Sequence, residues 1–280
     1  MILSDRKIFG RITLLFALLV VPVTTLVCEE VPTVTIVQDA AYPPFMMSED
    51  GSPSGIYADI VLEADSRLPA YKIDLKAAPW TRAKFLVETG KADGLLGTYF
   101  RPTARPWIKH YSSPMFSEEV YVYCRQGVAK KDWTYPDDYA GLLFTNNSGF
   151  GTPGPAFFKM VEKGTLAVVE EQTTEENLHL LQIGRADCYV QEQTAVLTHL
   201  RTGRYNSIEN IQRVSSEPAH IGYGLTFEED RMQQFAADMD VVLEEMTADG
   251  TIDRIISSHA QTCTVPQPVA KDSNRSTASC

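Results

Sequence analysis

The chain has 280 residues and carries 25 Lys and Arg against 36 Asp and Glu, which gives a formal net charge of −11. An acidic surface of this kind argues against nucleic acid or an anionic membrane as partner. The length is enough for one large domain or for two domains of ordinary size.

The N-terminal segment has the pattern of a secretory signal. Arg6, Lys7 and Arg11 precede an apolar run that is too short and too interrupted by proline for a membrane-spanning helix. We therefore predict that residues 1–28 are a signal peptide and that the mature protein is periplasmic. Ordinary cleavage at the end of this segment is expected, and lipid attachment at Cys28 is the alternative.

After the signal, apolar periodicity predicts strands that alternate with helices. The first set has strands at 33–39, 71–78 and 93–98 and helices at 55–68 and 80–89, the first helix with Ile56, Ile60, Leu62 and Ala64 at helical spacing. The second set has strands at 141–147, 166–171 and 187–191 and helices at 156–163 and 175–183. A long helix follows at 228–249, with Phe235, Met239, Val242, Leu243 and Met246 on its apolar face. Because parallel strands need crossover helices, two successive sets predict an α/β fold with two sheets.

One sequence unit occurs twice. "ETGKADGLLG" (88–97) and "QIGRADCYVQ" (182–191) each end a helix at glycine, continue with a basic residue and Ala-Asp, and enter a short apolar strand. Gly90 and Gly184 suit the left-handed end of a helix, and Asp93 and Asp187 are predicted to cap the turn. The repeat indicates that both halves of the chain share one architecture.

Four cysteines remain besides Cys28, namely Cys124, Cys188, Cys263 and Cys280. An oxidising compartment permits disulfides, but spacing alone does not fix their pairing. Cys124 and Cys188 both lie in strand-like runs, where they either pair with each other or stay buried thiols. Residues 265–280 are polar and are predicted to form a disordered tail.

Polar and aromatic residues follow the predicted strands. Open α/β sheets bind ligands beyond the carboxyl ends of their strands. The residues at these positions are two acids, one or two arginines, several aromatic residues and a glycine-rich loop. Arginine grips a carboxylate, acids hold an ammonium group, and aromatic faces cover a carbon skeleton, so this set would suit a zwitterion.

Six motifs in fixed order carry a family resemblance: "DAAYPPF", "GIYADI", "PWTRAKFLVETGKADGLLG", "TARPW...YSSPMF", "NLHLLQIGRADCYV" and "TADGTIDRI". With them, the chain from about 34 to 256 resembles the bacterial family-3 extracytoplasmic solute-binding proteins, the amino-acid-binding receptors of ABC transporters. The resemblance implies a two-lobe periplasmic-binding-protein (type II) fold. Each lobe would be a mixed, mainly parallel sheet flanked by helices, and two crossing segments near 117–123 and 218–223 would join the lobes. Lobe 1 would comprise 31–118 and 220–264, with lobe 2 inserted at 119–219.

The resemblance also implies a ligand site between the lobes. Residue by residue, it places Arg105 on the α-carboxylate of the ligand, Asp39 and Glu192 on its ammonium or a polar group, and Trp80 on its side chain. Further expected ligand contacts are Tyr42, Arg82, Gly97, Thr98, Phe100, Gly149, Phe150, Gly151 and Thr152. The loops "GTYFRPTAR" and "SGFGTPG" replace the hydroxyl-rich loops of the family, a departure that bears on the ligand side chain more than on the carboxylate clamp.

Each of these residues also has a structural alternative. Arg105 would be a solvated loop residue, Asp39 a turn cap and Trp80 a core residue at a helix start. Arg82 would be a surface residue and Glu192 a solvated acid in a first helical turn.

The resemblance implies a receptor and not an enzyme. The protein would capture a small carboxylate-bearing solute, foremost an amino acid, and deliver it to an inner-membrane ABC permease, acting as a monomer without cofactor or metal. One alternative is a periplasmic dehydratase of the same fold, using Glu192 or Asp39 on a cyclic prephenate-like acid. Another is a sensor that signals through a partner in trans.

Two other kinds of site are not favoured. "GFGTPG" (149–154) spells a dinucleotide-binding pattern, but Pro153 and Pro155 lack amides that a pyrophosphate would need. The five histidines have no metal-type spacing with each other or with cysteine.

Overall fold

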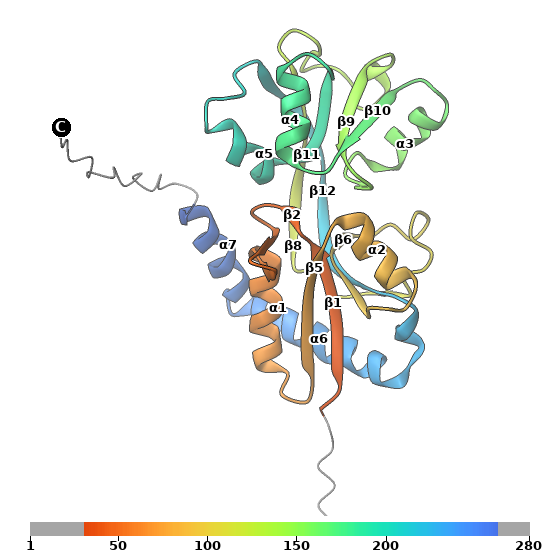
Figure 1. Cartoon of the computed structure of the whole chain (residues 1–280), viewed down its shortest axis with the longest axis vertical. Coiled ribbons are helices and arrows are strands. Elements are labelled where there is room, and N and C mark those ends of the chain that lie inside the picture. Colours follow the sequence, from red (N-terminus) through yellow and green to blue (C-terminus); the bar gives the residue numbers. More distant parts are fainter. Residues whose placement is uncertain (1–30, 263–280) are drawn as a thin grey trace, which may run out of the picture. The chain divides into compact units, whose positions relative to one another are not determined.

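Two long antiparallel strands, β8 (Phe116–Arg125) and β12 (Ile208–Tyr223), form the centre of the fold (Figure 1). The computed structural model describes residues 31–262. β12 pairs through Ala219–Tyr223 with β6 (Gly94–Tyr99), and β8 pairs through Val120–Cys124 with β11 (Cys188–Glu192). The two predicted sets of strands therefore attach to different parts of one ribbon.

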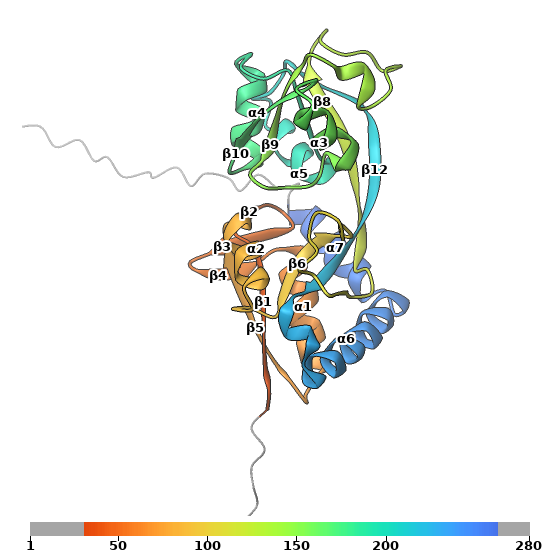
Figure 2. The same ribbon diagram turned by 90° about the vertical axis from the view of Figure 1, so that its right-hand side faces the viewer.

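Lobe 1 consists of the elements around the first set. β6, β1 (Thr33–Asp39) and β5 (Lys72–Ala78) are parallel to one another. The helices of this lobe are α1 (Ile56–Arg67), α2 (Trp80–Glu88), α6 (Asp230–Ala248) and α7 (Thr251–Thr262), and α1 packs against α6 and α7 (Figure 2). Its short elements are β2 (Ala41–Tyr42), β3 (Met46–Glu49), β4 (Ser52–Ser54), β7 (His110–Tyr111) and the 3-10 turn η2 (Leu225–Glu228).

Lobe 2 repeats this arrangement. β11, β9 (Leu143–Asn147) and β10 (Ala167–Glu171) are parallel. The flanking helices are α3 (Gly154–Glu162), α4 (Thr174–Gln182) and α5 (Gln193–Leu200), with the 3-10 turn η1 (Asp137–Tyr139). A capping box explains where α4 begins, because Thr173 accepts from the Glu176 amide while the Glu176 side chain accepts from the Thr173 amide.

The α/β two-lobe fold is confirmed, but the prediction of separate sheets is wrong in one respect. The strands form a continuous hydrogen-bonded path, β10-β9-β11-β8-β12-β6-β1-β5. The crossing segments predicted near 117–123 and 218–223 lie in the strands β8 and β12. As strands, they pair with each other from Ile208 to Ala219 and also satisfy the edge of each parallel set, which leaves the two sets joined through the antiparallel ribbon.

The repeated helix-to-strand unit forms the same contacts in both lobes. The Asp93 side chain accepts from the Thr35 amide at 2.8 Å, and the Asp187 side chain accepts from the Leu143 amide at 2.9 Å. Each aspartate amide donates in turn to the carbonyl of the same partner residue. The prediction that these aspartates cap their own turn is therefore wrong. They bind the backbone of the neighbouring parallel strand near its N-terminal end, which fixes the register of that strand.

Helix packing follows the predictions with one correction. The five apolar residues expected on the long helix are all buried, in α6. In α1, however, Leu62 is 51% exposed, whereas Tyr57 and Val61 are buried with Ile60. At 3.6 residues per turn, positions 57, 60, 61 and 64 share a face, and position 62 points away from it.

Cys124 and Cys188 form a disulfide, which settles the alternative left open by the sequence. The two residues are direct partners in the antiparallel β8–β11 ladder, and both are fully buried. The bond therefore ties the ribbon to the parallel strands of lobe 2.

The predicted signal peptide, Cys28, Cys263, Cys280 and the tail from 265 lie outside the described residues. Within residues 31–262, no helix combines the length and the hydropathy needed to cross a membrane.

Candidate functional site

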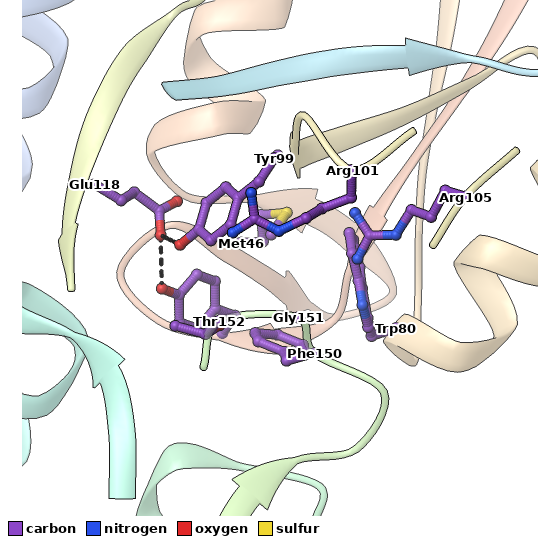
Figure 3. Close-up of a pocket in the computed structure, with 11 residues that line it drawn as sticks. Met46, Trp80, Tyr99, Arg101, Arg105, Glu118, Phe150, Gly151 and Thr152 are labelled. Carbon is purple, nitrogen blue, oxygen red and sulfur yellow. Dashed lines mark hydrogen bonds between the residues drawn. The ribbon is translucent and has the colours of Figure 1, made fainter. Parts of the chain in front are cut away.

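A cavity lies where side chains from both lobes and the ribbon converge (Figure 3). The empty space in it amounts to about 350 Å³ when its opening to solvent is counted. Four of its eleven lining residues are aromatic. The lining residues are Tyr42, Met46, Trp80, Gly97, Tyr99, Arg101, Arg105, Glu118, Phe150, Gly151 and Thr152.

Arg105 supplies the cavity with a buried positive charge. Its side chain is 7% exposed, donates to the Thr98 hydroxyl and lies 5.4 Å from the centre of the Trp80 ring. Burial lowers the pKa of Arg105 to about 10, because the charged form is desolvated. Among residues 31–262, no acidic side chain forms an ion pair with it. The guanidinium retains donors that an anion could fill.

Helix α2 and the loop after β9 hold the lobes together beside Arg105. The Trp80 indole N–H and the Lys84 ammonium group donate to the Gly149 carbonyl, at 3.1 and 2.8 Å. The Trp80 and Phe150 rings meet edge to face, with centroids 5.4 Å apart. Burial, and next the charge of Arg105, lowers the pKa of Lys84. A Cβ at Gly149 would lie 2.5 Å from the Lys84 Nζ, so a side chain there would displace the lysine end from its present position.

Glu118 supplies the cavity with a buried carboxyl group. It accepts hydrogen bonds from the hydroxyls of Tyr42 at 3.0 Å, Tyr99 at 2.6 Å and Tyr57. Burial raises the pKa of Glu118, and these hydroxyl donors act in the opposite direction. Tyr42 also donates weakly, at 3.4 Å, to the Gln191 side chain of lobe 2. A hydrogen-bonded chain therefore runs from lobe 1 through the ribbon residue Glu118 to lobe 2.

The two acids expected to hold an ammonium group are buried but do not line the cavity. Asp39 ends β1 and accepts from the Ala41 amide, and burial raises its pKa to about 6. Glu192 ends β11 and caps α5 by accepting from the Ala195 amide at 2.8 Å. Burial, and next the charge of Glu118, raises the pKa of Glu192 to about 8. The bond to the Ala41 amide agrees with the turn-cap alternative for Asp39, whereas Glu192 is a buried helix cap and not the solvated acid of its structural alternative.

The remaining predicted residues divide into three groups. Seven line the cavity together: Tyr42, Trp80, Gly97, Arg105, Phe150, Gly151 and Thr152. Thr98 and Gly149 lie behind the wall as partners of Arg105 and of Trp80. Arg82 and Phe100 do not line it: Arg82 stacks over Phe85, and Phe100 is 58% exposed and packs on Tyr111.

The positions of Arg82 and Phe100 outside the cavity follow from local geometry. Two helical positions separate Arg82 from Trp80, which turns the arginine by about 200° to the other side of α2. Phe100 directly follows Tyr99, and successive strand residues point to opposite faces, so Tyr99 enters the cavity instead.

Sequence reasoning missed four lining residues: Met46, Tyr99, Arg101 and Glu118. For two of them, the alternation of side-chain direction along a strand could have indicated a place in the cavity wall. Tyr99 shares a strand face with Gly97, and Glu118 shares one with Val120 and Val122, which are fully buried. An acid on the buried face of an alternating strand is a functional candidate, because burying a charge needs compensation. Met46 and Arg101 carry no comparable signal.

No metal site is evident in the described part of the chain, where no group of three or more His, Cys, Asp or Glu side chains is arranged to hold an ion. The chemistry available in the cavity is therefore that of one guanidinium, one carboxyl group, an arginine already paired with an acid, and an aromatic wall.

The sequence from residue 34 to 262 matches the family model of the bacterial extracellular solute-binding proteins, family 3. No curated protein sequence matches the chain. One similar solved structure is an ancestral arginine-binding protein bound to arginine, with TM-score 0.66 and 19% identity over 81% of this chain and 97% of that chain.

Two further structures are similar to the same degree. An ancestral amino-acid-binding protein described as a precursor of cyclohexadienyl dehydratase has TM-score 0.64 and 17% identity over 81% of this chain and 94% of that chain. A histidine kinase sensor domain with similarity to periplasmic binding proteins has TM-score 0.65 and 16% identity over 81% and 95% of the two chains. At these identities the likeness shows a common fold.

Proposed function

The chain belongs to the bacterial extracellular solute-binding proteins, family 3, and on this basis we propose that it captures a free amino acid in the cavity between its lobes. The carboxylate of the amino acid binds the Arg105 guanidinium, with Thr98 holding that guanidinium in place. The aromatic wall, with Trp80, Phe150 and Tyr42, packs against the rest of the ligand.

The observation that carries this proposal is a buried arginine without an acidic partner. Burying an unpaired charge is costly, and proteins usually compensate it with an opposite charge. Arg105 lacks such a partner in the described residues although it is 7% exposed and faces a cavity. An anionic ligand supplies the missing charge, and a planar carboxylate matches the fork of a guanidinium.

Binding favours the closed arrangement of the lobes by a shift of population. Phe150, Gly151 and Thr152 of lobe 2 line the same cavity as Arg105 and Trp80 of lobe 1. A ligand in the cavity contacts both sets only when the lobes are close together, so its extra affinity stabilises that state. The bonds from Trp80 and Lys84 to Gly149 support the same state.

We further propose the cellular setting that family membership suggests. The receptor is exported by the signal peptide at residues 1–28, acts as a monomer in the periplasm and delivers its ligand to an ABC permease. Its lobe 1 comprises 31–118 and 220–264, and its lobe 2 comprises 119–219, so that each boundary falls in or next to the ribbon strands β8 and β12.

Isothermal titration calorimetry with the amino acids tests the ligand role of Arg105. We expect Arg105→Ala to lose roughly 10- to 100-fold in affinity, since a buried charge-assisted pair contributes roughly 1.5–3 kcal/mol and its fork fixes the ligand orientation. Arg82→Ala is the matched control, because Arg82 lies on α2 outside the cavity. Unchanged affinity in a folded Arg105→Ala protein would refute the assignment.

A second candidate function is a lyase reaction on a cyclic acid. The observation in its favour is Glu118, a buried acid in an aromatic-lined cavity, which is the kind of environment that tunes a general acid. Incubating the purified protein with prephenate-like cyclic acids distinguishes the two functions. Catalytic turnover supports the lyase, whereas stoichiometric binding of amino acids without turnover supports the receptor.

A further inference from the structure

The cavity has a positive and a negative end. Arg105 lies beside Trp80 at one side, and Glu118 lies at the other, with Tyr99, Met46 and Arg101 between them (Figure 3). Within residues 31–262, neither charge has an ion-pair partner. Glu118 is 2% exposed and Arg105 is 7% exposed, so both ionisable groups are buried and face one shared space.

The hydrogen bonds of Glu118 favour the charged form of its carboxyl group, whereas burial raises its pKa. Three tyrosine hydroxyls converge on its two oxygens, and a hydroxyl donates to a carboxylate more strongly than to a neutral acid. The carboxylate is thus held by donors, but its charge is not neutralised by any of them. A cation entering the cavity would neutralise it.

The neighbouring charges keep the Glu118 end negative. Arg101 is the other cation that lines the cavity, and it is paired with Glu217 at 3.0 Å. At the Arg105 end the second nearby charge is Lys84, which is positive. The two ends therefore differ in sign even when the surroundings are included.

We propose that the ligand is a basic amino acid, whose α-carboxylate binds Arg105 and whose positively charged side chain points to Glu118. This inference rests on the proposed function and adds the class of side chain. The α-ammonium and α-carboxylate groups of an amino acid are attached to the same carbon atom, so both stay at the Arg105 end. The charge that reaches Glu118 therefore belongs to the side chain.

The aromatic wall suits such a side chain. Tyr42 and Tyr99 approach the Glu118 carboxylate with their hydroxyls, and their rings line the cavity. Phe150 packs edge to face on Tyr42 with centroids 5.3 Å apart. Aromatic faces attract cations and also cover the methylene groups of a long side chain, which an aspartate or glutamate ligand would not exploit.

Matched ligand pairs test the inference by calorimetry. L-arginine and L-citrulline have nearly the same shape but differ in charge. L-lysine and L-norleucine share the same carbon chain, and only lysine carries a terminal ammonium group. We expect wild-type protein to prefer the charged member of each pair by at least roughly tenfold, because a buried charge left unpaired by the neutral ligand is costly. Glu118→Gln should lower this preference by at least roughly tenfold.

Glu119→Gln is the matched control. Glu119 is the next residue of β8, points to the opposite face, and pairs with Arg213 outside the cavity. The variant removes one carboxylate from the same strand and should keep the wild-type preference. The ligand preference of the wild-type protein also tests the inference by itself. The inference can therefore be refuted even if the Glu118→Gln protein does not fold.

The outcomes separate this inference from the proposed function. If wild-type protein binds L-leucine or L-glutamate more tightly than L-arginine, L-lysine and L-ornithine, and Arg105→Ala abolishes that binding, the basic side chain is wrong and the amino-acid receptor stands. The same conclusion follows if folded Glu118→Gln keeps the full preference for charged ligands. If Arg105→Ala binds as well as wild type, the proposed function itself is wrong.

Discussion

Glu192 should make the protein less stable as the pH rises from about 5.5 to about 8.5. Its carboxyl group is 4% exposed, and burial raises its pKa from 4.5 to about 8. A group with a raised pKa binds its proton more tightly in the folded state, so it stabilises the fold at low pH. That stability is lost progressively as the pH rises from 4.5 through about 8.

The magnitude follows from the same two values. Between the two pKa values the loss is about 1.4 kcal/mol per pH unit. From pH 5.5 to 8.5 this amounts to about 3 kcal/mol from Glu192 alone. Glu192→Gln removes the titration but keeps an oxygen that can accept from the Ala195 amide, at an expected loss of about 1 kcal/mol for the weaker cap.

Urea unfolding followed by circular dichroism measures the effect at both pH values. We expect Glu192→Gln and wild type to have similar free energies of unfolding at pH 5.5, and the variant to be about 3 kcal/mol more stable at pH 8.5. Glu119→Gln, with its carboxylate at the surface of β8, is the control and should follow the wild-type pH dependence. A variant that loses as much stability as wild type between the two pH values would refute this account of Glu192.

Two further predictions concern the shared architecture and the disulfide. Asp93→Ala and Asp187→Ala should each lower the free energy of unfolding by about 1.5–3 kcal/mol, because each leaves an amide of a neighbouring strand, that of Thr35 or Leu143, without its charged acceptor. Urea titration measures this, and a loss in only one lobe would contradict equivalent roles. Replacing both Cys124 and Cys188 by serine should lower the melting temperature, since closing a segment with sequence separation 64 stabilises by about 4 kcal/mol in the chain-entropy estimate. Calorimetric scans of wild type with and without reductant provide the comparison, and equal melting temperatures would count against it.

Local patterns predicted most elements correctly because each depends on residues close in the chain. The ends of α2 and α4 are an example, since Gly90 and Gly184 have φ values of +68° and +73°, which glycine adopts most easily. Two helices, α5 and α7, were missed. α5 begins directly at the end of β11 without a separating turn, so the apolar pattern of the strand runs into that of the helix.

The candidate site shows which features the sequence could predict and which it could not. Arg105, Trp80 and the loop at Phe150 were identified through their place in family motifs, and the structure brings them together. Asp39 and Glu192 were identified in the same way, yet both lie behind the cavity wall. A motif records the position of a residue along the chain, whereas the direction of its side chain depends on the strand end and helix cap that surround it.

The sequence by itself determined the alternation of strands and helices, the repeated unit of both lobes and the buried face of the long helix α6. These features arise from periodicity and turn chemistry within short segments. Only the tertiary structure decided that the two crossing strands join both strand sets, that Cys124 pairs with Cys188, and that Glu118 faces the same cavity as Arg105. Each of these depends on segments far apart in the chain meeting in space, and burial changes the charge behaviour of the residues that meet there.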